Sequence, residues 1–573
     1  MTNDTAVNDI VVYDYDASPC VRRVKMTLIE KGLDYRIQSI DLSKMQQKSP
    51  EYLAINPNGL VPTLSHNGRI LYESAVINDY LEDQFPTISL QSASLEGQLE
   101  IREWQSYELA MAKTYRALMY ASVMGPLKRV ACTYEESLYI ANLATQNAGH
   151  LAWEAKVWNL KVLTIAEQQA HQKQLYEFVE RVERKLEGKR YLVDDKFTFA
   201  DIAVYPRLSM FPIVGIKINR HSFPNITSWW KRLEQRRSVS STQSPAQQSM
   251  LKLRESGLLR RLQNAYYGES GPSAFDRILF RLLKPVLRKK LKFDIALKEG
   301  SLPKKSLLLA ATPYPIPELP ALRMHFSYEL DQKMTFTLFG CADTPTTERI
   351  KWLLNYFDIR YKYEEVSAQN SRLCALNPTG EWPMLSVERE GDNNIRRIPG
   401  EMSESLNIID SEVIAEYLES IYYAKNADSV RHETLFSDAA FEMAQVRMWN
   451  SFDGSMEKSF SPYLLVESNR PAAAELQNCL NLIQEKMDLL EAALAHREYL
   501  VGERITYADI ALYSRMSLFG KVGLGQTLVG KPSINQWLIR VGEFFAPVNK
   551  AKEQPKSKSS KKANAQKVSN SNA

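Results

Sequence analysis

The sequence predicts an α/β layer followed by an all-helical domain, with this arrangement present twice in one chain. Two observations predict it: four sequence blocks recur in the same order, and each copy changes from strand-like to helical periodicity along its length. The chain of 573 residues is long enough for several hydrophobic cores. Its hydrophobic content of 44% and charged content of 24% exclude a mostly disordered or fibrous protein.

The recurring blocks indicate an internal duplication. They pair residues 12–35 with 338–361, 56–64 with 377–385, 72–82 with 409–419, and 191–209 with 499–517. In the first pair Ser18-Pro19 aligns with Thr344-Pro345, and Arg23 aligns with Arg349. Four blocks in one order do not arise by chance, so we interpret the chain as two copies of one unit.

The elements of the first copy follow from local patterns. Residues 10–15 are β-branched and aromatic, which predicts a strand. Ser18 as N-cap and Pro19 at the first helical position predict a helix of about 12 residues. Residues 34–40 predict a second strand, and residues 62–65 and 69–72 predict a hairpin around Asn67-Gly68.

Helical patterns then take over. Residues 73–85 have an apolar period typical of a helix, and residues from about 95 to 240 predict a domain without strands. Within it, Thr198 and Asp201 form a predicted capping box before an apolar run, and Thr506 and Asp509 repeat it in the second copy. This pattern gives Asp201 a role in folding and not in catalysis.

Each copy resembles a cytosolic glutathione transferase. The resemblance is carried by the S-P helix start at Ser18, the loop ending in V-P at Pro62, the E-S helix start at Ser74, and the T-x-A-D cap at Thr198. It implies a thioredoxin-like domain followed by a helical domain in each copy. The expected boundaries are 1–90 and 91–240 for copy one, a connector at 241–333, 334–424 and 425–547 for copy two, and a disordered basic tail at 548–573.

The resemblance implies glutathione as co-substrate, and its thiol must become a thiolate to act as nucleophile. Lowering the thiol pKa by about two units takes roughly 2.7 kcal/mol. A hydroxyl donor beside a helix N-terminus can supply this stabilisation, so Ser18 is the first catalytic candidate. Cys20 competes, because it lies in the first turn of the same helix and would favour thiol-transfer chemistry. Tyr15 is a third candidate, and both Ser18 and Cys20 also have purely structural interpretations as N-cap and core side chain.

The peptide part of glutathione needs anchors. By resemblance Val61 precedes a cis-proline, Pro62, and offers its backbone N–H and carbonyl to the ligand. Ser74, at a helix N-terminus, can bind the γ-glutamyl carboxylate, and Glu73 can bind its ammonium. Lys44 and Arg22 are weaker candidates for the glycine carboxylate.

The second copy keeps these anchors and changes the reactive turn. Asp410 and Ser411 stand where copy one has Glu73 and Ser74, and Trp382-Pro383 repeats the pre-proline edge. Thr344 replaces Ser18, and its β-branch restricts the rotamer that would face a sulfur. We therefore expect copy two to be weaker or inactive.

The expected function is a glutathione transferase that acts on a small apolar electrophile, as in detoxification. A glutathione-dependent dehalogenase, a thiol-transfer enzyme that uses Cys20, and a non-catalytic scaffold with the same fold remain alternatives. Family members usually dimerise, so we expect either an intramolecular pseudo-dimer of the copies or a homodimer. The five cysteines contain no CxxC pair and the histidines have no metal-ligand spacing, so no disulfide framework or metal is expected.

The net charge of +5 comes from two segments. Residues 548–573 hold seven Lys and one Glu, and residues 276–305 hold ten Lys and Arg and three acids. Residues 274–292 predict a basic amphipathic helix that either touches an anionic membrane or packs its apolar side on a copy. Neither basic segment interleaves aromatic residues, so nucleic acid is not an expected partner. The amino terminus lacks a signal-peptide pattern, and we expect a cytoplasmic protein.

Overall fold

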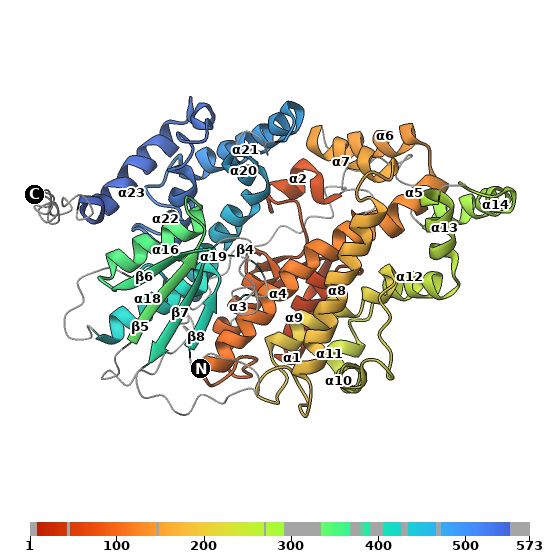
Figure 1. Cartoon of the computed structure of the whole chain (residues 1–573), viewed down its shortest axis with the longest axis horizontal. Helices are drawn as coiled ribbons and strands as arrows, with labels where there is room; N and C mark the ends of the chain where they lie inside the picture. The colour runs from red at the N-terminus through yellow and green to blue at the C-terminus, as the bar shows by residue number, and fades with distance from the viewer. Residues whose placement is uncertain are drawn as a thin grey trace, which may run out of the picture.

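The structure is a computed structural model that describes residues 8–42, 46–144, 148–268, 271–290, 334–366, 377, 380, 382–389, 405–425, 434–465 and 471–550. Figure 1 shows copy one, coloured red to yellow, beside copy two, whose sheet is green to cyan. The two predicted layers are present in each copy: a four-stranded sheet with its helices, and a separate helical layer.

The sheet of copy one has the strand order β2-β1-β3-β4. Its strands are β1 (Ile10–Asp14), β2 (Arg36–Ser39), β3 (Thr63–His66) and β4 (Arg69–Tyr72). β1 pairs parallel with β2 and antiparallel with β3, with Val12 opposite both Ile37 and Leu64. All four predicted strands are confirmed, and each boundary lies within two residues of its prediction. Asn67 and Gly68 adopt φ of 48° and 83° at the hairpin, as a two-residue turn requires.

The helices of this layer are α1 (Pro19–Glu30), α2 (Pro50–Leu53) and α3 (Ser74–Gln84), with a short 3₁₀ turn at Gln46–Lys48. Ser18 is the N-cap of α1 and Pro19 its first residue, as predicted. Val21, Val24 and Leu28 of α1 are fully buried with Val12 and Leu64 of the sheet. This packing fixes the turn between β1 and α1 at the edge of the helical layer.

The helical layer of copy one begins with the 25-residue helix α4 (Leu95–Met119), which continues through a π-turn at Tyr120–Met124 into α5 (Gly125–Ala131). The helices that follow are α6 (Tyr134–Ala144), α7 (Ala148–Trp158), α8 (Ile165–Lys185), α9 (Phe199–Leu208), α10 (Pro224–Glu234) and α11 (Arg237–Ser240). The predicted capping box is confirmed at the start of α9. The buried Asp201 carboxylate accepts hydrogen bonds from the Thr198 and Leu192 backbone N–H groups and from the Trp229 indole.

The segment after residue 240 continues the helical layer. It forms α12 (Pro245–Glu255), α13 (Leu258–Tyr267) and α14 (Ala274–Lys290). Leu259 and Leu262 of α13 and Phe280 and Leu287 of α14 are buried in the same hydrophobic cluster as α4 and α9. This half of the expected connector therefore packs on copy one.

Copy two repeats the plan. Its sheet has the order β6-β5-β7-β8, formed by β5 (Met334–Gly340), β6 (Tyr361–Glu365), β7 (Met384–Arg389) and β8 (Ser405–Ile409). Its helices are α16 (Pro345–Tyr356), α18 (Ser411–Lys425), α19 (Ala440–Ser455), α20 (Glu457–Leu464), α21 (Ala473–Leu494), α22 (Tyr507–Met516) and α23 (Pro532–Lys550). The capping box of Thr506 and Asp509 is again present.

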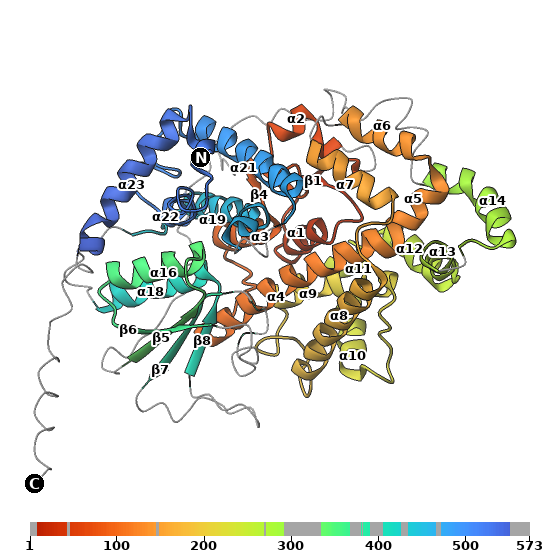
Figure 2. The same ribbon diagram turned by 45° about the horizontal axis from the view of Figure 1, so that its top comes forward.

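The two copies pack against each other through α3 of copy one and α19 of copy two. Ala440 and Ala444 of α19 are buried in the hydrophobic cluster that holds Ile77 and Tyr80 of α3. Beside them, the buried Arg447 of α19 lies 3.5 Å from the carboxylate of Asp79 on α3. Figure 2 shows these two helices side by side near the centre of the molecule. The contact brings copy two within reach of the site of copy one.

Across the described residues, no helix is both long enough and apolar enough to cross a membrane.

Candidate functional site

The turn between β1 and α1 carries the predicted catalytic pair. The partly buried Ser18 hydroxyl lies 3.4 Å from the Val21 backbone nitrogen, and the Ser18 N–H donates to the Tyr15 carbonyl at 2.8 Å. The hydroxyl is thus held at the positive end of the α1 dipole, where a negative charge is stabilised. Burial raises the pKa of Tyr15, and the nearby Asp41 raises it further, so this phenol stays protonated at neutral pH.

Cys20 lies two residues further, between two guanidinium groups. Its Sγ is 3.7 Å from a terminal nitrogen of Arg23 and 3.7 Å from a terminal nitrogen of Arg207. The side chain is partly buried and is not in a disulfide. Ser18 and Cys20 therefore belong to one turn but to different surroundings: Ser18 faces a helix end, and Cys20 faces paired cations.

The predicted peptide anchors of copy one are open. The Val61–Pro62 bond is cis, and the Val61 backbone N–H and carbonyl make no hydrogen bond to any described residue. Ser74 begins α3, and its hydroxyl likewise has no hydrogen-bond partner within the described ranges, although the residue as a whole is only 8% exposed. Free backbone groups and a free hydroxyl at a helix N-terminus are the kinds of group that can pair with an extended peptide and its carboxylate.

Glu73 takes part in a polar chain that joins the two copies. The Asn58 amide donates to Glu73 Oε1 at 3.0 Å, and Lys486 of α21 donates to Asn58 Oδ1 at 3.4 Å. Lys48 donates to the Asn58 carbonyl at 3.1 Å. Burial raises the pKa of Glu73. The hydrogen bond from Asn58 and the charge of Lys486 lower that pKa, but they do not cancel the effect of burial. Burial lowers the pKa of Lys486 to about 8, and Lys48 lowers it further, whereas Glu73 and Glu485 raise it.

The reactive turn of copy two is occupied by its own side chains. The Thr344 hydroxyl donates to the Cys341 carbonyl at 3.0 Å and lies 2.8 Å from the buried Thr347 hydroxyl. No backbone N–H in the first turn of α16 donates to the Thr344 hydroxyl, whereas the Val21 N–H of α1 donates to the Ser18 hydroxyl. The hydroxyl of this turn therefore points back into the protein.

The groups of copy two that align with the predicted peptide anchors also make hydrogen bonds within the protein. Trp382–Pro383 is cis, and Thr346 donates to the Trp382 carbonyl at 2.9 Å. The Ser411 hydroxyl accepts from Tyr507 at 3.3 Å, and the residue aligned with Tyr507 in copy one is Phe199, which has no hydroxyl. Asp410 Oδ1 accepts from the Glu412 backbone at 2.8 Å. Asp410 and Glu73 both have a positive φ, of 82° and 72°, so the two copies share the backbone geometry at this turn. They differ in that the Ser411 hydroxyl and the Trp382 carbonyl of copy two have hydrogen-bond partners within the protein.

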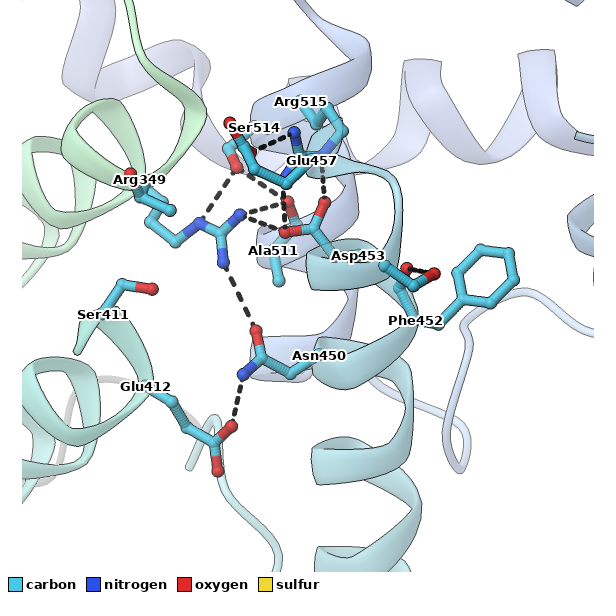
Figure 3. Close-up of polar contacts among 12 residues, drawn as sticks. Arg349, Ser411, Glu412, Asn450, Phe452, Asp453, Glu457, Ala511, Ser514 and Arg515 are labelled. Carbon is cyan, nitrogen blue, oxygen red and sulfur yellow. Dashed lines mark hydrogen bonds and ion pairs between the residues drawn. The ribbon is translucent and has the colours of Figure 1, made fainter. Parts of the chain in front are cut away.

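A buried arginine–carboxylate–arginine cluster joins the two layers of each copy. In copy two, Asp453 accepts from Arg349 at 2.5 Å and from Arg515 at 2.6 Å, as Figure 3 shows. In copy one, Glu108 pairs with Arg23 and, at 2.8 Å, with Arg207. Burial raises the pKa of Asp453, but the two arginines outweigh it and hold that pKa below its usual value.

This cluster and Lys486 were not predicted from the sequence. A fifth repeat block carries the signal for the cluster: IREWQSYE at 101–108 recurs as VRMWNSFD at 446–453, which aligns Glu108 with Asp453. Because Arg23 already aligns with Arg349, an acid and a base repeated together would have indicated a structural ion pair. No local pattern marks Lys486, whose position depends on how the copies pack.

The two weaker candidates for the glycine carboxylate do not reach the anchors. The buried Arg22 guanidinium donates to Ser209, Thr242 and the Val239 carbonyl in the helical layer. Lys44 lies outside the described residues.

Comparison with known families matches both layers of both copies. The family description "Glutathione S-transferase, N-terminal domain" matches residues 17–84 and 338–426. The description "Glutathione S-transferase, C-terminal domain" matches residues 150–237 and 453–543.

Three similar proteins each cover about two fifths of this chain. Glutathione S-transferase 3 of Zea mays is 26% identical over 40% of this chain and 91% of its own length. The maleylacetoacetate isomerase of Dictyostelium discoideum is 28% identical over 38% of this chain and 86% of its own length. The crystal structure of the beta-etherase LigF from Sphingobium matches with a TM-score of 0.37 and 24% identity, over 41% of this chain and 98% of that one. The chain belongs to the glutathione S-transferase family and carries the family's two domains twice.

Proposed function

We propose that copy one binds glutathione and activates its thiol at Ser18 for attack on a small apolar electrophile. The Ser18 hydroxyl at the N-terminus of α1 can donate to a thiolate that lies over the same helix end. The hydroxyl proton then points to sulfur, and the helix dipole stabilises the negative charge. The thiolate attacks the electrophile, a carbon–sulfur bond forms, and the leaving group departs with its electron pair.

A single contrast carries the proposal. The groups that would hold glutathione in copy one, the Val61 backbone and the Ser74 hydroxyl, have no partner among the described residues. The matching groups of copy two, the Trp382 carbonyl and the Ser411 hydroxyl, already have protein partners. Because a ligand must displace those partners, copy two is expected to bind glutathione weakly or not at all.

We assign copy two a supporting role. Its helix α19 packs against α3 of copy one. The same packing brings Lys486 beside the proposed anchor of the γ-glutamyl group. In this arrangement the ammonium of Lys486 neutralises the glutamyl carboxylate while Ser74 and the α3 N-terminus donate to it. The two copies then act as an intramolecular pseudo-dimer with one working site.

A conjugation assay tests the proposed reaction. The full chain is incubated with glutathione and a chlorodinitrobenzene, and the thioether is followed by absorbance. Saturable, glutathione-dependent product formation that is lost in Ser74→Ala is the expected result. A chain that neither forms the thioether nor binds glutathione would overturn the enzyme proposal and favour the scaffold alternative.

A second candidate function rests on Cys20. Its sulfur lies 3.7 Å from a terminal nitrogen of Arg23 and 3.7 Å from a terminal nitrogen of Arg207, and both groups can donate to it. As a thiolate, Cys20 could attack the glutathione sulfur of a mixed disulfide between glutathione and a substrate thiol, releasing the substrate thiolate and forming a Cys20–glutathione disulfide. A second glutathione thiolate would then attack that disulfide, releasing glutathione disulfide and the Cys20 thiolate. Loss of glutathione-dependent disulfide reduction in Cys20→Ala, with conjugation unchanged, would identify this activity.

The position of Lys486 predicts a pH-dependent affinity. Lys486→Met is expected to weaken binding of S-methylglutathione about tenfold at pH 7, the loss of one charge-assisted hydrogen bond. Because the pKa of Lys486 is lowered to about 8, the wild-type ammonium loses its proton as pH rises through that value. The difference between wild type and variant should therefore shrink above pH 8. Calorimetric titration between pH 6.5 and about 9 measures it, and S-methylglutathione removes the titration of the thiol.

The matched control for this experiment is Lys521→Met, an exposed lysine of the same copy that pairs with Asp343. It should leave the affinity unchanged at every pH. Equal affinities of wild type and Lys486→Met at pH 7 would show that copy two adds nothing to the anchor.

A further inference from the structure

Helix α14 (Ala274–Lys290) carries two apolar faces, of which the protein covers one. Phe280 and Leu287 are 7% and 5% exposed and pack into the core of copy one. On the other side, Phe275, Ile278, Leu282 and Val286 are 59%, 62%, 69% and 51% exposed. We call these four residues the outer stripe.

The outer stripe is more than scattered surface hydrophobicity. Its members follow one another at spacings of three, four and four residues, so they share one side of the helix. Among the described residues, no other helix has more than two large apolar side chains exposed to this degree. A contiguous apolar patch of this kind marks a surface that binds a partner.

The charges of the same helix define the partner. Arg277, Arg281, Lys284 and Lys289 are exposed, and none has an ion-pair partner among the described residues. The acid of the helix, Asp276, is already bound by Arg261 and Ser273, so it does not offset them. The free surface of α14 is therefore apolar and strongly cationic.

The arrangement of these cations fits a surface and not a pocket. Arg281 and Lys289 each follow a stripe residue, Ile278 and Val286, by three positions and so lie beside the stripe. Long basic side chains can reach outward from such positions while their stems cover apolar surface. Figures 1 and 2 both show α14 at the outer end of the molecule, far from the contact between the copies.

We propose that α14 lays its outer stripe on an anionic lipid bilayer. Phe275, Ile278, Leu282 and Val286 would enter the boundary between headgroups and acyl chains, and the four free cations would neutralise lipid phosphates and carboxylates. The buried face would stay on copy one, so the bound helix keeps its contacts with α5 and the ion pair of Asp276 with Arg261 of α13. For residues 274–292 the sequence is compatible with two alternatives, packing on a copy and contact with a membrane. Packing describes the buried face of α14, and membrane contact is our proposal for the outer stripe.

Vesicle sedimentation of the full chain tests the proposal. Wild type is expected to sediment with phosphatidylcholine–phosphatidylserine vesicles and not with pure phosphatidylcholine vesicles. The variant with Ile278→Gln, Leu282→Gln and Val286→Gln should lose about tenfold in partitioning, as should the variant with Arg277, Arg281, Lys284 and Lys289 changed to Gln. All changed side chains are exposed, so glutathione conjugation should be unaffected in both variants.

Matched controls remove similar groups elsewhere. Val529→Gln with Ile539→Gln takes away exposed apolar surface, and Lys217→Gln with Arg220→Gln takes away exposed charge, and both should sediment like wild type. The proposal fails if wild type does not bind anionic vesicles, or if it binds neutral vesicles equally well. It also fails if the stripe variant sediments like wild type, or if light scattering shows that the stripe instead joins two chains.

Discussion

Ser18→Ala is expected to lower kcat/KM for glutathione conjugation at pH 7 by up to about 25-fold, while the affinity for S-methylglutathione stays near the wild-type value. The hydroxyl contributes to lowering the thiol pKa from about 8.5 toward 6.5, and loss of that whole shift would reduce the thiolate fraction at pH 7 from about three quarters to about 3%. S-methylglutathione carries no thiol, so its binding depends on Val61 and Ser74 and not on Ser18. The pH dependence of the rate reports the change directly, because its acid limb should move to higher pH in the variant.

Two controls make the result specific. Cys20→Ala should keep conjugation close to the wild-type rate if Ser18 activates the thiol. Thr344→Ala changes the aligned residue of copy two, whose hydroxyl is already bound to the Cys341 carbonyl, and should have no effect. Loss of conjugation in Cys20→Ala, with Ser18→Ala active, would transfer the catalytic role to the cysteine.

Glu108→Gln is expected to have the largest effect on stability. Glu108 is fully buried and balances both Arg23 and Arg207, so its loss leaves two buried cations without a carboxylate. Breaking a buried ion pair on one side typically costs about 3 to 5 kcal/mol. For a unit of this size the melting temperature should fall by roughly 6 to 20 °C. Thermal unfolding followed by circular dichroism, in parallel with the Asp453→Asn variant of copy two, measures the loss.

The control lies on the same helix. Glu103 pairs with Arg181 at the surface, where both side chains are about a third exposed, and Glu103→Gln should cost less than about 1 kcal/mol. If Glu108→Gln is no more destabilising than Glu103→Gln, the cluster does not hold the two layers together.

Because the Asp453 pKa is held below its usual value, the stabilisation it gives is present above the pKa of an unfolded aspartate. It should be lost as pH falls through the lower folded value.

The elements that local chemistry determines could be predicted from the sequence. Three motifs specify their own geometry within a few residues: the S-P start of α1, the Asn67-Gly68 turn and the T-x-A-D cap. The S-P start and the T-x-A-D cap have counterparts in copy two, which supports their assignment as helix starts. The fold of both copies follows from these signals and from periodicity.

The polar contacts of the site could be predicted only in part. Ser18, Pro62 and Ser74 lie on such local motifs, but Lys486 is 413 residues from Glu73 along the chain and reaches its neighbourhood through the packing of two copies. In copy two the Trp382 carbonyl and the Ser411 hydroxyl are occupied because of the rotamers of Thr346 and Tyr507, which no pattern in the sequence specifies. The exposure of one apolar face of α14 likewise depends on what packs beside it.

The central claim is that the chain has one glutathione site and that it lies in copy one. Calorimetric titration of the full chain with S-methylglutathione tests this claim most directly. We predict one equivalent per chain, with an affinity that Ser74→Ala weakens and Ser411→Ala leaves unchanged. Two equivalents per chain, or a single site lost in Ser411→Ala and kept in Ser74→Ala, would contradict the account.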